Sequence, residues 1–177
     1  TLNNENQYSG SGSLGYISNI KQTQGAQVHL KDMWVWMESQ ETETISPEMF
    51  EEFFLPAMQE IAGLFHYTYY GCCEHLHDRF ETIEKYIHNI RCVSVSPWSD
   101  KKIMGSLLQN KYVFSAKLTP QFISQDLPEE AQENELRSIY DSLQNKKLVE
   151  YIYRDVYEYK NDPQKFNRWI KLVKSFW

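Results

Sequence analysis

The sequence predicts an α/β protein built around parallel strands. From about residue 27 onward, short apolar and aromatic runs alternate with longer amphipathic stretches, giving five strand–helix pairs in a row. Strands separated by helices pair in parallel through right-handed crossovers. Two architectures fit: an open doubly wound sheet, and part of a (β/α)8 barrel, which is complete only at about 250 residues. The first strand is not followed by GxGxxG, which disfavours a dinucleotide-binding doubly wound fold.

The first pair combines a strand at 28–36 with a helix at 46–64. Ser46 is a suitable N-cap, and Pro47 fits the first helical position. Pro56 is expected to kink this helix, because its ring removes a backbone hydrogen bond and clashes with the preceding turn. The apolar face is expected to contain Met49, Phe50, Phe53, Phe54 and Ile61.

The other four pairs repeat this pattern. Gly71 ends the second strand, Ser99 is expected to cap a helix that runs to about residue 109, and Asp162 with Pro163 opens the last helix. The remaining strands are expected at 66–73, 91–96, 111–118 and 148–157. The remaining helices are expected at 75–88, 99–109, 129–144 and 164–177.

Composition and charge exclude several classes of partner. Hydrophobic residues make up 41% of the 177 residues and aromatic residues 15%, which is typical of a globular chain with a packed core or a ring-lined pocket. The net charge is −6 and no stretch concentrates Lys and Arg, so we expect no nucleic-acid partner. No apolar run approaches the ~18 residues of a membrane span, so we expect no membrane partner.

Cysteine usage and the N-terminal composition suggest a setting for the chain. The three cysteines are odd in number and include an adjacent pair, which argues against a disulfide framework and favours a reducing, cytoplasmic compartment. Residues 1–26 are polar and Gly/Ser-rich and lack the apolar region of a signal peptide. We expect them to form a linker or loop ahead of one domain at 27–177, within a larger protein.

Five segments together resemble one family. The first carries the pattern SPE-x-F-x-x-F-x-x-P, and the others carry a Gly-Cys-Cys-Glu strand end, a Val-Ser-Pro-Trp strand end and an Asn-Asp-Pro-Gln helix start. Over about residues 30–175 the chain resembles an uncharacterised branch of the uroporphyrinogen decarboxylase superfamily. The segments lie at 39–61, 69–79, 93–102, 113–120 and 155–172.

That superfamily contains tetrapyrrole decarboxylases and zinc-dependent enzymes that transfer methyl groups from corrinoids to thiols. The resemblance implies a TIM (β/α)8 barrel, of which this chain is the C-terminal part with about five βα units. It also implies that the N-terminal strands of the barrel lie outside this chain. Two open strand edges are then expected to be covered by the companion half, a second copy or a helix. A corrinoid is implied as a substrate or as the cofactor of a partner protein.

The candidate site residues lie where strands end, because active sites of barrels form at the carboxyl ends of the strands. The candidate catalytic residues are Cys73, Glu74 and Asp155, the last as a general base. The candidate substrate-binding residues are Asp32, Glu38, Trp98, Lys117 and Tyr157. His66 and Cys92 begin their strands, so both are expected at the opposite end of the sheet, outside the site.

A cluster after the second strand is the candidate metal site, because thiolate, carboxylate and imidazole groups are zinc ligands. The candidate zinc ligands are Cys72, Cys73, Glu74 and His75. The thiol-methylating relatives hold zinc with a His-x-Cys motif and a distant Cys. Here Tyr70 or Gly71 stands at the His position, and the distant Cys has no counterpart. In the alternative interpretation, one cysteine packs as a small buried hydrophobe and the other lines a pocket.

Three functions therefore stay open at the level of sequence. The first is a methyltransferase-like enzyme acting on a corrinoid or a small methylated substrate. The second is tetrapyrrole decarboxylation, which handles a polycarboxylate and needs several arginines, whereas only Arg79 and Arg154 lie near strand ends. The third is a ligand-binding barrel domain without catalysis, in which the cysteines are only packed.

Overall fold

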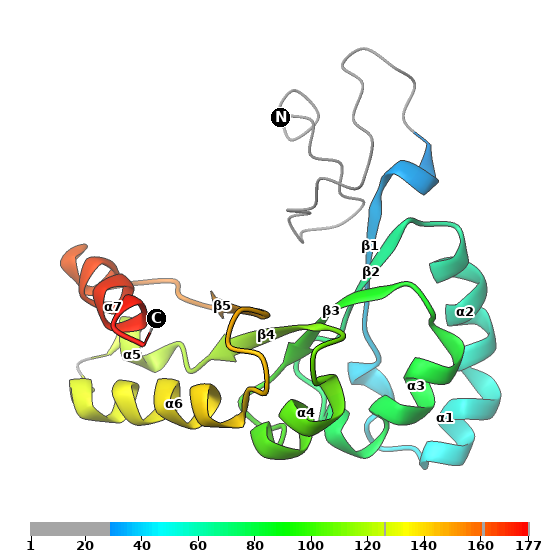
Figure 1. Ribbon diagram of the computed structural model, residues 1–177, viewed down its shortest axis with the longest axis horizontal. Coiled ribbons are helices and arrows are strands. Elements are labelled where there is room, and N and C mark those ends of the chain that lie inside the picture. The colour runs from blue at the N-terminus through cyan, green and yellow to red at the C-terminus, as the bar shows by residue number, and fades with distance from the viewer. Residues whose placement is uncertain (1–28, 126, 161, 177) are drawn as a thin grey trace.

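The structure, a computed structural model, describes residues 29–125, 127–160 and 162–176. Five parallel strands form one sheet in the order β1-β2-β3-β4-β5, accompanied by seven α-helices in the described residues (Figure 1). The predicted α/β architecture with parallel strands is confirmed. The linker expected at 1–26 lies outside the described residues.

The elements alternate along the chain as the sequence predicts. The strands are β1 (Trp34–Met37), β2 (Tyr67–Tyr70), β3 (Ile90–Val95), β4 (Val113–Leu118) and β5 (Val149–Tyr153). The helices are α1 (Pro47–Phe53), α2 (Leu55–Gly63), α3 (Phe80–Tyr86), α4 (Lys101–Leu108), α5 (Gln121–Ser124), α6 (Glu129–Ser142) and α7 (Gln164–Lys174). Short 3-10 turns are η2 (Leu30–Asp32), η3 (Gln40–Thr42) and η4 (Leu76–Asp78). In the described ranges, no helix has the length and apolar character needed to cross a membrane.

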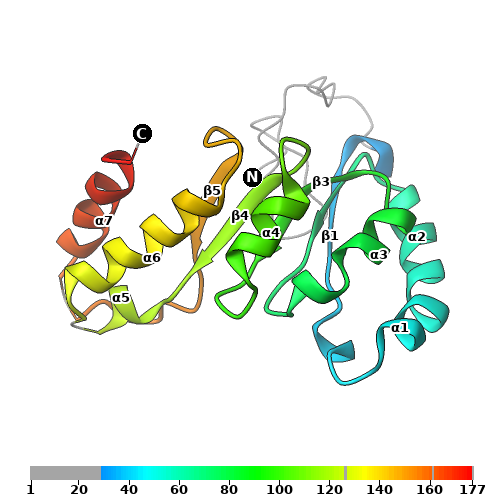
Figure 2. The same cartoon turned by 60° about the horizontal axis from the view of Figure 1, so that its bottom comes forward.

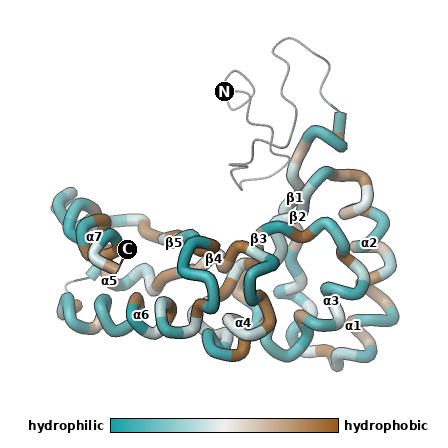
Figure 3. The backbone as a smooth tube through the Cα atoms, in the orientation of Figure 1, coloured by the Kyte–Doolittle hydropathy of each residue, from teal (hydrophilic) through white to brown (hydrophobic). Residues whose placement is uncertain are grey.

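The main core lies between one face of the sheet and the helices. Tyr70, Val93 and Phe114 point from neighbouring strands into this core, and Figure 2 shows α2, α3, α4 and α6 along that face. Figure 3 shows hydrophobic residues along β3 and β4 and a mostly hydrophilic α6. The other face carries a second cluster made of strand residues alone. Its members are Trp34, Trp36, Tyr67, Tyr69, Cys92, Val113 and Ile152.

This layering differs from that of a doubly wound sheet, one of the two architectures that the sequence leaves open. A doubly wound sheet reverses its strand order and carries helices on both faces. Here the strands follow one another in sequence order, and the second cluster contains no helical residue. The described chain is therefore a singly wound five-stranded segment, consistent with part of a (β/α) barrel.

The first strand is shorter than the sequence predicts. Residues 30–32 form a 3-10 turn in which the Asp32 carboxylate accepts a 2.9 Å hydrogen bond from the backbone N–H of His29. The strand begins only at Trp34. The expectation that Asp32 lies at the carboxyl end of this strand is therefore wrong, because the local turn places it at the amino end.

The first helix divides where proline interrupts its hydrogen bonding. Ser46 Oγ accepts from the N–H of Met49, which confirms the predicted N-cap. α1 and α2 meet at Phe54, two residues before Pro56, which confirms the predicted break. The predicted apolar face is wrong for most of its members, because a single side of α1 and of α2 is buried. Phe50, Leu55 and Ala62 are buried, whereas Met49, Phe53, Phe54 and Ile61 are exposed.

Two later details also differ from the sequence prediction. Asp100, and not Ser99, caps α4, because its Oδ1 accepts from the N–H groups of Lys102 and Ile103. β5 ends at Tyr153, so the strand expected at 148–157 is too long. Asp155 follows with φ of 58°, outside the extended region of a strand.

Candidate functional site

A tight turn at Gly71 carries the chain out of β2 at the carboxyl edge of the sheet. Gly71 has φ of 102°, a conformation that L side chains rarely adopt. A Cβ atom there would lie 2.8 Å from Leu76 Cδ1 and 3.2 Å from Ser94 Cβ. Glycine is therefore required both by the backbone angle and by the close packing. The turn places Cys72 over the ends of the neighbouring strands.

The backbone of this turn is held by side chains from three other strands. Trp36 of β1 donates its indole N–H to the carbonyl oxygen of Gly71 at 3.0 Å. Ser94 of β3 and Lys117 of β4 both donate to the carbonyl oxygen of Cys72, at 3.0 and 2.8 Å. These residues lie on the helix-free face of the sheet, so the turn is fixed from the side where a barrel has its interior.

The thiol of Cys72 has a polar environment of its own. The guanidinium Nη1 of Arg154, which follows β5, donates to Cys72 Sγ at 3.5 Å, and its carbon lies 5.3 Å from the ring centre of Trp36. We call Trp36, Glu38, Cys72, Lys117 and Arg154 the carboxyl-edge cluster. Trp36 and Lys117 belong to β1 and β4. The other three residues lie one or two positions after β1, β2 and β5.

Burial and charge set the protonation of this thiol. Burial, and after it hydrogen bonding to the Glu38 carboxylate, raise the pKa of Cys72 to about 12, whereas the ammonium of Lys117 opposes the shift. A carboxylate beside a thiol favours the protonated form of the thiol. Cys72 is therefore a neutral thiol at pH 7.

The two cations of the cluster lack a carboxylate partner. Among the described residues, neither Lys117 nor Arg154 forms an ion pair. Burial lowers the pKa of Lys117, and the positive charge of Arg154 lowers it further. Two like charges held around one residue repel each other, so an anionic group bound between them would be stabilised.

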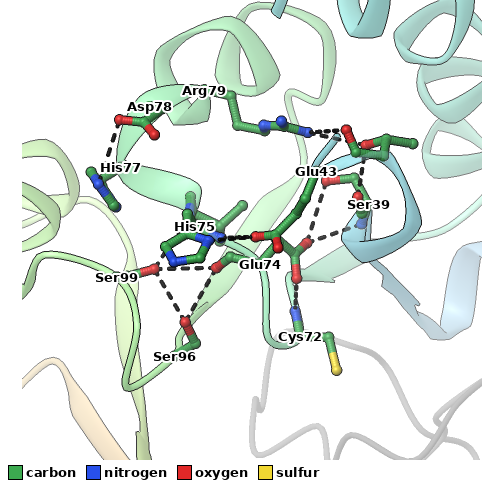
Figure 4. Close-up of polar contacts among 12 residues, drawn as sticks. Ser39, Glu43, Cys72, Glu74, His75, His77, Asp78, Arg79, Ser96 and Ser99 are labelled. Carbon is green, nitrogen blue, oxygen red and sulfur yellow. Dashed lines mark hydrogen bonds and ion pairs between the residues drawn. The ribbon is translucent and has the colours of Figure 1, made fainter. Parts of the chain in front are cut away.

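Glu74 has a structural role on the other side of the turn. Its Oε1 accepts from the backbone N–H of Ser39 at 2.9 Å, and its Oε2 accepts from the N–H of Cys72 at 2.6 Å. The residue is only 1% exposed. Figure 4 shows the Cys72 sulfur pointing away from this carboxylate. Glu74 therefore ties the β1 and β2 strand ends together and does not face the thiol.

The imidazole of His75 is also directed away from the thiols. Its Nδ1 lies 2.8 Å from Glu43 Oε1, and half of its side chain is exposed. This contact keeps His75 at the surface beside η3 (Figure 4). Of the four candidate zinc ligands, the structure brings together only Cys72 and Cys73, whose sulfur atoms are 3.7 Å apart.

The remaining candidates lie outside the cluster. Trp98 is 61% exposed in the turn after β3, and Tyr157 is 90% exposed. Tyr157 contacts only the nearby carboxylate of Asp155, at 3.4 Å. Glu38 and Lys117 are the two predicted substrate-binding residues that reach Cys72. His66 lies at the amino end of β2 as expected.

Sequence reasoning assigned no site role to Ser94, Trp36 or the Arg154–Cys72 contact. Cys92 and Ser94 are two residues apart on β3, so their side chains both point to the helix-free face of the sheet. That alternation is a signal for Ser94, since a polar residue in an apolar strand needs a partner. No sequence signal places Arg154 beside Cys72, because 82 residues separate them.

Comparisons with known proteins identify no relative. No family model matches the chain, and no significant match is found among curated proteins or solved structures. The resemblance to the uroporphyrinogen decarboxylase superfamily stays a prediction.

Proposed function

We propose that this chain carries part of a (β/α)8 barrel enzyme that transfers a methyl group, with the thiol of Cys72 as the methyl acceptor. The observation that carries the proposal is the placement of this thiol between an acid and two cations. Glu38 lies on one side, while Arg154 contacts the sulfur and Lys117 contacts the same residue. A thiol with a base and a cationic partner is the usual arrangement for a sulfur nucleophile.

The proposed reaction follows from these contacts. A methyl donor binds at the carboxyl edge, and the Cys72 sulfur forms a bond to its methyl carbon. The bond between that carbon and the donor breaks, and the donor keeps the electron pair. The thiol proton passes to the Glu38 carboxylate, which acts as a general base. Arg154 stabilises the negative charge that develops on sulfur while the proton leaves.

Lys117 and Arg154 also indicate which substrates fit. A donor or a second substrate with an anionic group would place that group between the two unpaired cations. Trp36 offers an aromatic surface beside them, against which a small apolar methyl group can pack. Small methylated acids and corrinoids with phosphate or carboxamide side chains both belong to the classes that this cluster could accept.

Of the four predicted zinc ligands, only the two cysteines could bind a zinc ion at this site. Glu74 and His75 do not fit the predicted ligand set, because the Glu74 carboxylate binds the N–H groups of Ser39 and Cys72, and the Glu43 contact holds the His75 ring away from the thiols. No group of three or more His, Cys, Asp or Glu residues in the described ranges is arranged to hold a metal ion. We therefore derive the reaction from the thiol, the carboxylate and the cations.

A companion half of the barrel is the proposed partner. β1 and β5 are the edges of the described sheet, and exposed strand edges favour pairing. Phe53 and Leu64, on the helices next to β1, are 62% and 53% exposed. A further strand on β1 with its helix against these side chains would cover both, whether it comes from the same polypeptide or from a second copy.

The test of this function uses methylcobalamin as methyl donor and follows the loss of its cobalt–carbon absorbance over one equivalent of protein, without any added thiol. The wild-type chain should accelerate demethylation, and Cys72→Ser should remove the acceleration. Cys92→Ser is the matched control, because Cys92 is a buried cysteine of β3 that lies outside the cluster. Equal rates for wild type and Cys72→Ser would refute the acceptor role of Cys72.

Tetrapyrrole decarboxylation is the second candidate, and the unpaired pair of cations favours it. Lys117 and Arg154 would each bind one carboxylate of a tetrapyrrole. Saturable quenching of coproporphyrin fluorescence by the wild-type chain, lost in a Lys117→Met and Arg154→Met double variant, would support this alternative. Binding without either reaction would instead support the ligand-binding domain.

A further inference from the structure

Two thiols lie side by side at the outer rim of the carboxyl-edge cluster. Cys72 Sγ and Cys73 Sγ are 3.7 Å apart. Cys72 is 8% exposed, whereas Cys73 is half-buried, so a reagent from solvent meets Cys73 first. Methyl transfer as proposed uses Cys72 alone and gives Cys73 no role.

The pair is poorly suited to a disulfide bond. Neighbouring Cα atoms are about 3.8 Å apart across a trans peptide, whereas disulfides usually need at least about 4.4 Å. The pair is better suited to one atom that bonds both sulfurs. Two sulfur bonds of about 2.3 Å to one atom can span sulfurs up to about 4.6 Å apart. The observed 3.7 Å lies within that reach.

The number of available thiols limits which element could bridge the two sulfurs. Cys92 pairs with Tyr69 within the sheet, whereas Cys72 and Cys73 follow the turn at Gly71 outside it. The described residues therefore offer two thiols and no third. Trivalent arsenic forms three bonds, so two thiols complete a centre that already carries one carbon substituent, whereas inorganic arsenite would keep one hydroxyl group.

We propose that Cys72 and Cys73 form a chelating dithiol site for an organic arsenic(III) compound of the type R–As(OH)2. Each sulfur forms a bond to arsenic and displaces one hydroxyl group. Each displaced hydroxyl leaves as water with the proton of the attacking thiol, so two thiols yield one dithioarsenite and two waters. Arsenic stays trivalent, and no oxidant is required. Soft thiolate ligands suit such a soft centre.

The surroundings of the pair support this chemistry. Arg154 donates to Cys72 Sγ, and Lys117 holds the carbonyl group of the same residue. Both cations stabilise negative charge on sulfur during the exchange. Gly71 and the Glu74 contact fix the backbone on either side, so the two sulfurs are held near each other before the ligand binds.

The test titrates the protein with phenylarsine oxide, which hydrates to the diol, and counts adducts by intact-mass spectrometry. The wild-type chain should bind one equivalent, which ethanedithiol then removes. Cys72→Ser and Cys73→Ser should each bind roughly a hundredfold more weakly, because a second bond to the same ligand forms at high effective concentration. Cys92→Ser should bind as tightly as wild type.

Two results would overturn the proposal. One is wild-type affinity retained in Cys73→Ser or in Cys73→Ala, each checked for folding by circular dichroism. The other is a second equivalent bound by the wild-type chain, or an adduct that ethanedithiol fails to remove, because either would place the arsenic outside the two-thiol site. The assay requires no methyl transfer, so its failure leaves the proposed function standing, and failure of methyl transfer leaves the dithiol site standing.

Discussion

The guanidinium of Arg154 lies 3.5 Å from the sulfur of Cys72, although 82 residues separate them in the chain. Arg154 directly follows β5, and Cys72 lies in the turn that follows β2. Parallel strands bring all their carboxyl ends to one edge of the sheet, which makes this contact possible. The proposed methyl transfer depends on this contact most directly.

Replacing Arg154 tests that dependence. Arg154→Gln should slow demethylation of methylcobalamin by roughly tenfold to a hundredfold, since hydrogen bonds to charged groups contribute about 1.5–3 kcal/mol. The control is Arg137→Gln, which removes an exposed arginine paired with Glu133 on α6. Equal rates for Arg154→Gln and Arg137→Gln would show that the guanidinium does not act on the thiol.

The protonation of Cys72 should respond in opposite directions to its two charged neighbours. Because the Glu38 carboxylate raises the pKa of Cys72 from its ordinary value, Glu38→Gln should lower that pKa. Because the Lys117 ammonium opposes this shift, Lys117→Met should raise the pKa. The thiolate is the reactive form, so alkylation at pH 8–9 should become faster in the first variant and slower in the second.

The labelling experiment has an internal control. Burial raises the pKa of Cys92 to about 12 as well, but this thiol lies away from Glu38 and Lys117. Peptide mass spectrometry after timed exposure to iodoacetamide reports both cysteines in one digest. Parallel changes at Cys72 and Cys92 would indicate a general loosening of the fold and contradict the electrostatic explanation.

Glu74 should prove important for stability. Glu74→Gln replaces one carboxylate oxygen by an amide nitrogen, so one of the backbone N–H groups of Ser39 and Cys72 loses its acceptor. An unsatisfied buried donor costs about 1–3 kcal/mol, and we expect a loss of that size in urea unfolding. Glu60→Gln, on the exposed surface of α2, should change the unfolding free energy by less than about 0.5 kcal/mol. A stability equal to that of the control would contradict the structural role.

The exposed apolar side chains of α1 and α2 should mediate association. In the isolated chain, the edge beside β1 is expected to bind a second copy, and Phe53→Glu should shift sedimentation towards the monomer. Ile103→Glu is the matched control, because Ile103 is 45% exposed on α4, away from that edge. A wild-type chain that sediments as a monomer at all concentrations would contradict this use of the surface.

Local patterns predicted the order and type of the main elements, because strand and helix signals here are regular and clearly punctuated. Ser46, Pro56 and Gly71 are examples in which one residue determines a cap, a break or a turn. The exposed face of α1 and α2 was not predictable, since it depends on how the break at Phe54 rotates one helix against the other. The need for glycine at position 105 was not predictable either, because a Cβ there would lie 2.0 Å from the carbonyl oxygen of Ser142 on α6.

The candidate site was predictable in place but not in membership. Of the residues that the carboxyl-end rule selects, Glu38, Cys72, Cys73 and Lys117 lie near one another. The rule also selected Glu74 and His75, whose side chains turn towards Ser39 and Glu43 because those partners lie in the loop after β1. Sequence spacing gives no information about which way a side chain turns after its strand ends.

The most direct test of the central claim is to locate the transferred methyl group. The wild-type chain is incubated with methylcobalamin without any added thiol, digested and analysed by peptide mass spectrometry. We predict a methyl group on Cys72, absent from Cys92 and reduced roughly tenfold to a hundredfold in Arg154→Gln. Methylcobalamin consumed while Cys72 stays unmodified, or no methyl group on any cysteine of the folded protein, would contradict the account.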